Sequence, residues 1–156
     1  MGMRERGQHS GGEGYVAIEQ RIDAPAESVA AYVGDFRNAK EWMVGVEGVK
    51  RLSDDLYRLR LESPVGRLEP EAKILEHGDG LIRWTYTSSI EGSGEVTVAS
   101  IGEGGSSCVV SYAGGFRLKG KVLNRAARFV GMEKFARKNG ERSLQRLKHL
   151  MEARRY

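Results

Sequence analysis

Three tyrosines occupy positions where a phenolic hydroxyl could take part in acid–base chemistry. Tyr57, Tyr86 and Tyr112 each fall in a segment that alternates apolar and polar residues, on the apolar side of the alternation. Such alternation is typical of a strand with one buried face, so we expect all three side chains to point inward. A buried hydroxyl needs a hydrogen-bond partner, and in a cavity it can orient a ligand or transfer a proton. These tyrosines are therefore the candidate catalytic residues.

The other reactive side chains form no recognisable catalytic or metal-binding pattern. Cys108 is the single cysteine, so the sequence excludes an internal disulfide and a cysteine-based metal cluster. The histidines are His9, His77 and His149, which are widely separated in the sequence. No Ser-His-Asp, Cys-His or zinc-ligand spacing connects these residues. We therefore expect neither a metal nor a cofactor.

The elements that would position the tyrosines are strands. After Trp42 the apolar residues recur with a period of two, and short turns separate the segments. The predicted strands cover 15–22, 47–52, 56–62, 67–76, 81–88, 95–101 and 107–116. Gly92 and Gly94 are assigned to a turn, and Pro70 indicates an edge strand or a bulge. Successive strands joined by short turns predict an antiparallel sheet.

Two short helices are predicted between the first and second strands. Asp23 can cap exposed N–H groups, and Pro25 suits the first turn of a helix over 26–33. Gly34 can end this helix, and a second short one follows from Phe36 to about residue 41.

A long amphipathic helix is predicted over 131–153, with a separate helical segment over 122–130 before it. The long helix would extend about 35 Å. Ala136, Gly140 and Ser143 lie in the middle of its apolar stripe, where a filled core would favour larger side chains. Glycine inside a helix costs about 1 kcal/mol relative to alanine. Either the helix contacts the sheet closely there, or it leaves space for a bound molecule.

Within this order of elements, one N-terminal motif and one C-terminal segment stand out. They are Ile22-Asp-Ala-Pro25, Val29, Asp35-Phe36, Trp42 and the segment 144–152. Together with the order of elements, these residues resemble the START-like helix-grip superfamily, also called SRPBCC. The superfamily includes polyketide cyclases and dehydrases, aromatases and lipid-transport proteins. The resemblance covers about residues 14–153.

The resemblance implies an α+β helix-grip fold. In this fold a curved antiparallel sheet of about seven strands surrounds a long C-terminal helix, and two short helices after the first strand close one end. We expect a single START-like domain over 14–156. Residues 1–13 consist mainly of glycine, serine and charged residues, and we expect a disordered tail there.

A curled sheet that faces one helix can enclose an apolar cavity. The expected lining combines Trp42, the inward positions of the strands and the apolar stripe of the helix. It consists of Trp42, Tyr57, Leu59, Leu61, Leu68, Ala72, Ile74, Ile82, Trp84, Tyr86, Val110, Tyr112, Phe116, Phe129, Met132, Ala136, Gly140 and Ser143. For Trp42, a core anchor and a ligand contact are both open.

The favoured function is binding or transport of a hydrophobic small molecule, such as a lipid, a quinone or a polyketide-like compound, without catalysis. The alternative is a polyketide cyclase, aromatase or dehydratase that acts in the same cavity. Such an enzyme would need an inward acid–base residue with a shifted pKa.

Charge is unevenly distributed along the chain. Residues 1–116 carry 12 Lys and Arg against 18 Asp and Glu, whereas residues 117–156 carry 13 against 3. The basic segment is either a solvated helix face or an interaction module for a membrane surface or an acidic partner. No nucleic acid is expected, because base-stacking aromatics do not accompany the basic stripe. Without a signal peptide or an apolar run of about 18 residues, we expect a cytoplasmic protein.

Overall fold

The computed structural model describes residues 13–88, 90–120 and 131–154. The strands are β1 (Glu13–Ile22), β2 (Val46–Ser53), β3 (Leu56–Leu61), β4 (Glu71–Gly78), β5 (Leu81–Tyr86), β6 (Ile90–Ile101) and β7 (Ser107–Leu118). The helices are α1 (Ala26–Gly34), the 3₁₀ turn η2 (Phe36–Asn38), α2 (Ala39–Trp42) and α4 (Met132–Ala153). None of these helices combines the length and apolar composition that a membrane-spanning segment needs.

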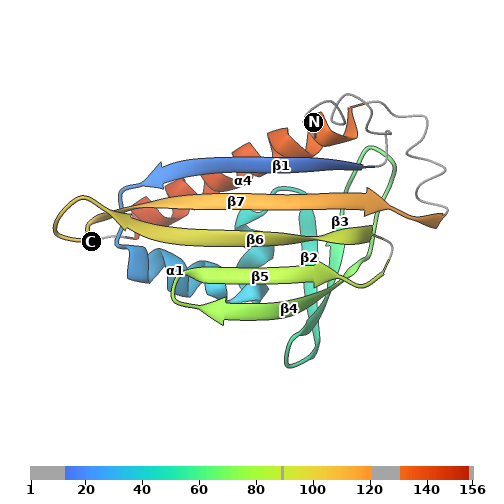
Figure 1. Cartoon of the computed structure of the whole chain (residues 1–156), viewed down its shortest axis with the longest axis horizontal. Helices are drawn as coiled ribbons and strands as arrows, with labels where there is room; N and C mark the ends of the chain where they lie inside the picture. Colours follow the sequence, from blue (N-terminus) through green and yellow to red (C-terminus); the bar gives the residue numbers. More distant parts are fainter. Residues whose placement is uncertain (1–12, 89, 121–130, 155–156) are drawn as a thin grey trace, which may run out of the picture.

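The seven strands form one antiparallel sheet in the order β1-β7-β6-β5-β4-β3-β2 (Figure 1). The first two strands in the chain are therefore the two edges of the sheet. The segment α1–η2–α2 connects these edges and packs against one end of the sheet. The expected helix-grip fold, with short helices after the first strand and a long C-terminal helix, is confirmed.

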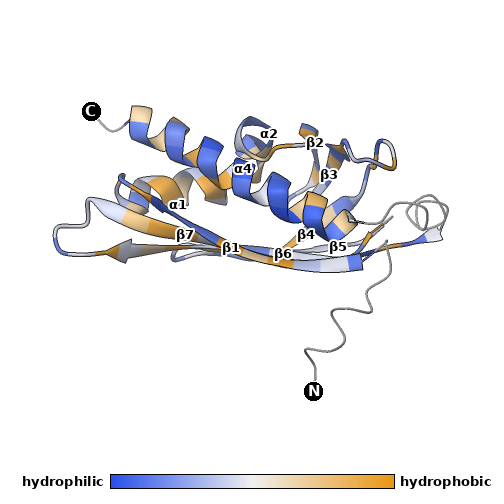
Figure 2. Cartoon of the chain, turned by 90° about the horizontal axis from the view of Figure 1, so that it is seen from above, coloured by the Kyte–Doolittle hydropathy of each residue, from blue (hydrophilic) through white to orange (hydrophobic). Residues whose placement is uncertain are grey.

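Helix α4 runs along β1, on the same side of the sheet as α1 and α2 (Figure 2). Both ends of α4 are hydrogen-bonded to the β1 region. Near its start, the Tyr15 backbone N–H donates to Glu133 Oε2 at 2.7 Å. Near its end, the Asp23 backbone N–H donates to Glu152 Oε2 at 2.9 Å. These bonds place the apolar stripe of α4 over the sheet.

The turn from β1 into α1 differs from the prediction in one detail. Pro25 is the N-cap residue of α1, and no side chain caps this helix. The Asp23 carboxylate instead accepts a hydrogen bond from Ser107 Oγ at 3.0 Å. Asp23 therefore connects the end of β1 to the start of β7, and the prediction of an Asp23 cap was wrong.

The predicted turn at 92–94 was also wrong, because both glycines lie inside β6. A Cβ atom at Gly94 would lie 2.5 Å from Trp84 Cζ2, and one at Gly92 would lie 2.1 Å from the Gly115 oxygen. The positive φ of Gly92, +141°, is also a conformation that other residues rarely adopt. These glycines allow close approach across the sheet, where β5 ends at Tyr86 and β6 already begins at Ile90.

The fourth strand is shorter than the sequence pattern predicts. It begins at Glu71, and in the four residues before it Leu68 forms one isolated bridge with Leu61. Pro70 cannot donate to a ladder, but its carbonyl accepts from the Leu59 N–H at 2.9 Å. Of the expected N-terminal tail, residue 13 belongs to β1, and the rest lies outside the described residues.

Candidate ligand-binding cavity

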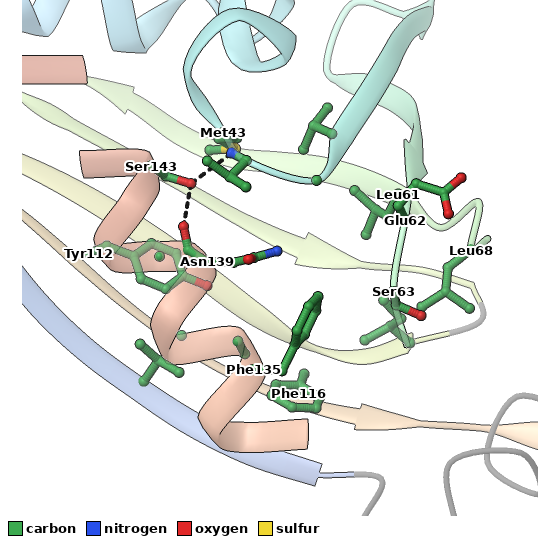
Figure 3. A pocket seen from close by; sticks show the side chains of 18 of the residues that line it. Met43, Leu61, Glu62, Ser63, Leu68, Tyr112, Phe116, Phe135, Asn139 and Ser143 are labelled. Atoms are coloured by element: carbon green, nitrogen blue, oxygen red, sulfur yellow. Dashed lines mark hydrogen bonds between the residues drawn. The ribbon is translucent and has the colours of Figure 1, made fainter. Parts of the chain in front are cut away.

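A cavity of about 210 Å³ lies between the sheet and the N-terminal half of α4 (Figure 3). Its floor comes from β5, β6 and β7, its roof from α4, and one end from the loop that follows α2. The residues that line it are Val16, Trp42, Met43, Val44, Gly45, Val46, Leu61, Glu62, Ser63, Leu68, Trp84, Tyr86, Ile90, Tyr112, Gly114, Gly115, Phe116, Leu118, Met132, Phe135, Ala136, Asn139, Gly140, Ser143 and Leu144. Most of these side chains are apolar or aromatic.

Two aromatic rings lie across a pair of glycines on the floor. Gly94 of β6 and Gly114 of β7 are direct partners in the sheet. The Trp84 indole covers Gly94, and the Tyr112 ring covers Gly114, where a Cβ atom would lie 2.5 Å from the Tyr112 Oη. The two ring centroids are 6.3 Å apart, and the ring planes differ by 32°. The two rings therefore occupy the space where side chains at 94 and 114 would otherwise stand.

The small residues of α4 serve both of the purposes that the sequence left open. A Cβ atom at Gly140 would lie 2.7 Å from Ile18 Cδ1, so this glycine lets α4 approach β1 closely. Ala136 and Gly140 also line the cavity, where longer side chains would occupy the space. Close helix–sheet contact and an open space therefore occur side by side.

Ser143 fastens the loop at one end of the cavity to the helix. Its Oγ accepts a hydrogen bond from the Val44 backbone N–H at 2.8 Å and donates one to the Asn139 carbonyl at 2.7 Å (Figure 3). In the same loop, Gly45 has a φ of +96° and lies against the Asn139 amide. The Asn139 side chain extends from α4 toward the cavity. Ser143 thus holds the end wall in place as well as lining the space.

Polar side chains are few in this lining, and almost all of them are uncharged. Glu62 is the one charged residue among those named above, and no Lys, Arg or His is among them. Burial raises the pKa of the Tyr112 phenol, and it also raises the pKa of the Tyr86 phenol, where the nearby Trp84 indole opposes part of the rise. Both phenols are therefore neutral at physiological pH. The cavity favours uncharged molecules, because a buried anion would have no cation to pair with.

The structure brings eleven of the predicted cavity residues together. They are Trp42, Leu61, Leu68, Trp84, Tyr86, Tyr112, Phe116, Met132, Ala136, Gly140 and Ser143. Trp42 is only 3% exposed, so it is both a core anchor and part of the lining. Tyr86 and Tyr112, two of the three candidate catalytic residues, are in this set.

Six other predicted residues lie in the filled core away from the cavity, and this placement corrects the expectation. They are Tyr57, Leu59, Ala72, Ile74, Ile82 and Val110. Phe36 of η2 enters this part of the sheet and packs on Tyr57, with ring centroids 5.2 Å apart. Alternation correctly predicted that these residues face inward, but it could not show that the η2 turn fills the space above them. Phe129, the remaining predicted residue, lies outside the described residues.

Several lining residues were missed in the sequence. Phe135 and Asn139 lie three and seven residues after Met132, so helical spacing places them on the same side and could have identified them. Nothing in the sequence indicated that Gly114 and Gly115 line the cavity. A glycine pair inside a strand has no side chains to pack, so it suggests a weakened strand or a bulge and not a cavity wall. Among the residues that the structure describes, no group of three or more His, Cys, Asp or Glu could hold a metal ion.

Comparisons with known proteins agree with this architecture. The family model described as polyketide cyclase/dehydrase and lipid transport matches residues 15–152. No curated protein sequence matches the chain.

Solved structures resemble the chain in fold at low sequence identity. The Zhui aromatase/cyclase from Streptomyces sp. R1128 has a TM-score of 0.70 at 15% identity, covering 91% of this chain and 95% of its own. A START superfamily protein from Mycobacterium smegmatis has a TM-score of 0.67 at 14% identity, covering 89% and 97%. A conserved protein from Geobacillus kaustophilus has a TM-score of 0.70 at 13% identity, covering 92% and 97%.

Proposed function

The chain belongs to the polyketide cyclase/dehydrase and lipid transport family, within the START-like superfamily, and we propose that it binds and carries a compact, uncharged hydrophobic molecule. The apolar cavity between the sheet and α4 is the observation that carries this proposal. Two aromatic rings on the floor and small residues on the roof create a space that can accept a ligand. The family binds hydrophobic small molecules, and the cavity supplies a specific place for one.

The cavity volume limits the size of the ligand. A cavity of roughly 150 Å³ lined by apolar side chains accepts benzene, whereas sites for drug-sized ligands begin at roughly 300 Å³. At about 210 Å³, the cavity suits a molecule of one or two rings, such as a small quinone or a short aromatic ketone. A lipid chain or a longer polyketide would have to extend beyond this space.

Filling the cavity tests the proposal directly. Ala136→Phe would place a ring in the space, whereas Gln145→Phe would place the same ring on the exposed face of α4. We expect native mass spectrometry of the purified wild-type protein to show a bound small molecule. Gln145→Phe should keep this molecule and Ala136→Phe should lose it. Equal occupancy in all three proteins would contradict binding at this site.

An enzymatic role in the same cavity is the second candidate, and the two phenols favour it. Because burial raises their pKa values, Tyr86 and Tyr112 stay protonated and can donate a proton or a hydrogen bond, as a cyclase or dehydratase would need. Tyr86→Phe and Tyr112→Phe should slow turnover of a poly-β-ketone substrate by tenfold or more, on the order expected for a lost general acid. Tyr57→Phe, which removes a phenol outside the cavity, is the matched control. Unchanged turnover in both cavity variants would remove this candidate.

The exposed face of α4 supports an interaction role in addition to ligand binding. Its exposed cations are Lys134, Arg137, Lys138, Arg142 and Arg146. Within the described ranges, none of the ion pairs involves these five side chains. An anionic membrane surface or an acidic protein would complement this charge. Binding to vesicles that contain phosphatidylserine should weaken steeply as salt rises, and salt-independent binding would argue against an electrostatic contact.

We also propose that the protein works in the cytoplasm. The buried free thiol of Cys108 supports a reducing compartment. Fractionation of cells that express the tagged protein would test this assignment, and recovery with secreted material would contradict it.

A further inference from the structure

The exposed side of α4 carries a row of cations, which we call the basic face. It consists of Lys134, Arg137, Lys138, Arg142 and Arg146, and it extends about 18 Å along the helix. The other exposed residues between its ends are Glu141 and Gln145, so this stretch has a net charge of +4. Among the described residues, no ion pair neutralises any of these five cations.

The opposite side of the molecule lacks this excess of unpaired charge. On the sheet face that points away from α4, arginines pair with carboxylates of neighbouring strands. Arg58 Nη2 lies 3.2 Å from Glu71 Oε2, and Arg83 Nε lies 3.2 Å from Glu95 Oε1. A cation that is already paired gains less from an external anion. Charge complementarity therefore favours an anionic partner on the helix side of the molecule.

The composition of the basic face favours a lipid surface over a folded protein. Between residues 134 and 149, every exposed residue of α4 is charged or polar, and none is aromatic or aliphatic. Specific protein interfaces depend on desolvated aromatic or aliphatic anchors, and lysine is depleted from their cores. The headgroups of an anionic bilayer need only cations within a Debye length of the surface, and each cation adds to the attraction.

The basic face also borders the cavity. Phe135 and Asn139 of α4 line the cavity and are only half-buried, so solvent reaches this part of the lining (Figure 3). Lys138 follows Phe135 by three residues, and Arg142 follows Asn139 by three. Residues at this spacing are neighbours on the surface of a helix. Cations of the basic face therefore lie beside the solvent-accessible rim of the cavity.

We propose that the basic face is a docking surface for anionic lipid bilayers, and that docking brings the rim of the cavity to the membrane with which it exchanges a hydrophobic ligand. Docking needs the charge alone, whereas the exchange rests on the proposed function. A ligand that passes directly between bilayer and cavity avoids exposing its apolar surface to water. Glu62, a carboxylate of the lining, is itself paired with Arg67 at 3.4 Å and therefore opposes the contact little.

Co-sedimentation with vesicles tests the docking surface through two variants of equal net charge. Lys138→Gln/Arg142→Gln removes two cations of the basic face, and Lys50→Gln/Lys73→Gln removes two exposed cations of the sheet. On vesicles of phosphatidylcholine and phosphatidylserine at low salt, the helix variant should bind about 25-fold more weakly than the wild type, about fivefold for each cation. The sheet variant should differ from the wild type by less than about threefold. Equal weakening of both variants, or no binding of the wild type, would overturn the proposal.

Other anionic polymers test the choice of partner. Polyglutamate represents an acidic protein surface, and a short DNA duplex represents a nucleic acid. At the same salt, we expect both to bind the wild type more weakly than the vesicles do. Tighter binding of either polymer, lost in Lys138→Gln/Arg142→Gln, would assign the basic face to that class of partner and overturn the lipid assignment.

Paramagnetic broadening by spin-labelled lipid tests the orientation on bilayer nanodiscs that contain phosphatidylserine. The amide signals of Phe135 and Asn139 should broaden, whereas those of Thr97 and Ser111, on the strand positions that point away from α4, should not. Equal broadening of the two sets would overturn the orientation.

Ligand occupancy separates failure of docking from failure of the proposed function. Ala136→Phe fills the cavity without changing the charge of α4, so it should dock as the wild type does but lose the bound molecule. Loss of docking with ligand occupancy intact would overturn the docking surface alone. Intact docking with equal ligand occupancy in Ala136→Phe and the wild type would overturn binding in the cavity, and with it the exchange, but not the docking surface.

Discussion

The two halves of the helix–sheet interface contain the same elements but differ in how they are filled. In what we call the closed half, the C-terminal part of α4 places Leu147 and Met151 on the sheet, and both are almost fully buried. In the open half, the N-terminal part of α4 contributes Ala136 and Gly140. The large residues of the closed half pack against the sheet, whereas the small residues of the open half leave the cavity above the sheet.

The sheet shows the same contrast. Val96 and Val110 of the closed half are completely buried, and they lie on β6 and β7. Further along the same two strands, Gly94 and Gly114 take the corresponding inner positions in the open half. Protein interiors are normally close-packed, so removing side-chain volume from both facing surfaces creates a hollow unless another element enters. Phe36 enters the closed half, and no comparable described residue fills the open half.

The largest expected loss of stability follows from truncating a large side chain in the closed half. Leu147→Ala removes a side chain with no exposed surface, and we expect the free energy of unfolding to fall by about 2–5 kcal/mol. Phe135→Ala removes a larger but half-buried ring that already borders the cavity, so its loss should be at most about 2 kcal/mol. Denaturant unfolding measures both. A larger loss for Phe135→Ala would contradict the division into filled and hollow halves.

A glycine substitution tests the floor of the open half. In Gly94→Ala the new methyl group would collide with the Trp84 indole, so we expect a loss of about 1–3 kcal/mol from overpacking. Gly34→Ala is the control, because nothing lies within 4 Å of its added Cβ and its φ is not positive. It should be neutral, or stabilising by up to about 1 kcal/mol. Thermal unfolding of the pair would detect the difference, and equal stabilities would show that the indole moves away freely.

Alkaline pH should lower the free energy of unfolding through a buried phenol of the open half. An unfolded tyrosine ionises near pH 10, whereas burial keeps the Tyr112 phenol neutral above that value. Its contribution to stability is therefore complete below pH 10 and is lost as the pH rises further. At pH 11 the wild-type protein should lose about 1.4 kcal/mol more than Tyr112→Phe, relative to pH 8. Identical pH profiles of unfolding would indicate that this phenol reaches solvent.

The smallest expected effect concerns the end wall of the cavity. Ser143→Ala removes the acceptor of the Val44 N–H, and we expect a loss of about 1 kcal/mol together with faster hydrogen exchange at Val44. Ser100→Ala, on an exposed position of β6, serves as the control. Unchanged exchange at Val44 would mean that the loop holds its position without Ser143.

The fold followed from local patterns. Alternation with period two identified the strands, and the stripe from Met132 to Leu150 identified α4, because both periods arise from backbone geometry alone. Helical spacing also explains why Val29, Tyr32 and Val33 of α1 are buried on one side of that helix. The prediction of a turn at 92–94 failed because glycine suits two different structural settings. Gly92 and Gly94 can form a turn or allow close cross-strand contact, and their neighbours in sequence do not distinguish the two.

The sequence by itself determined which side chains face the interior, because the direction of a side chain depends on the position of its residue within its own strand or helix. It could not determine which inward residues border a hollow. That outcome depends on what stands opposite them, such as Phe36 over Tyr57 or Ala136 over the glycine floor. The volume between two surfaces belongs to neither segment alone, so the division between core and cavity was decided only by the tertiary structure.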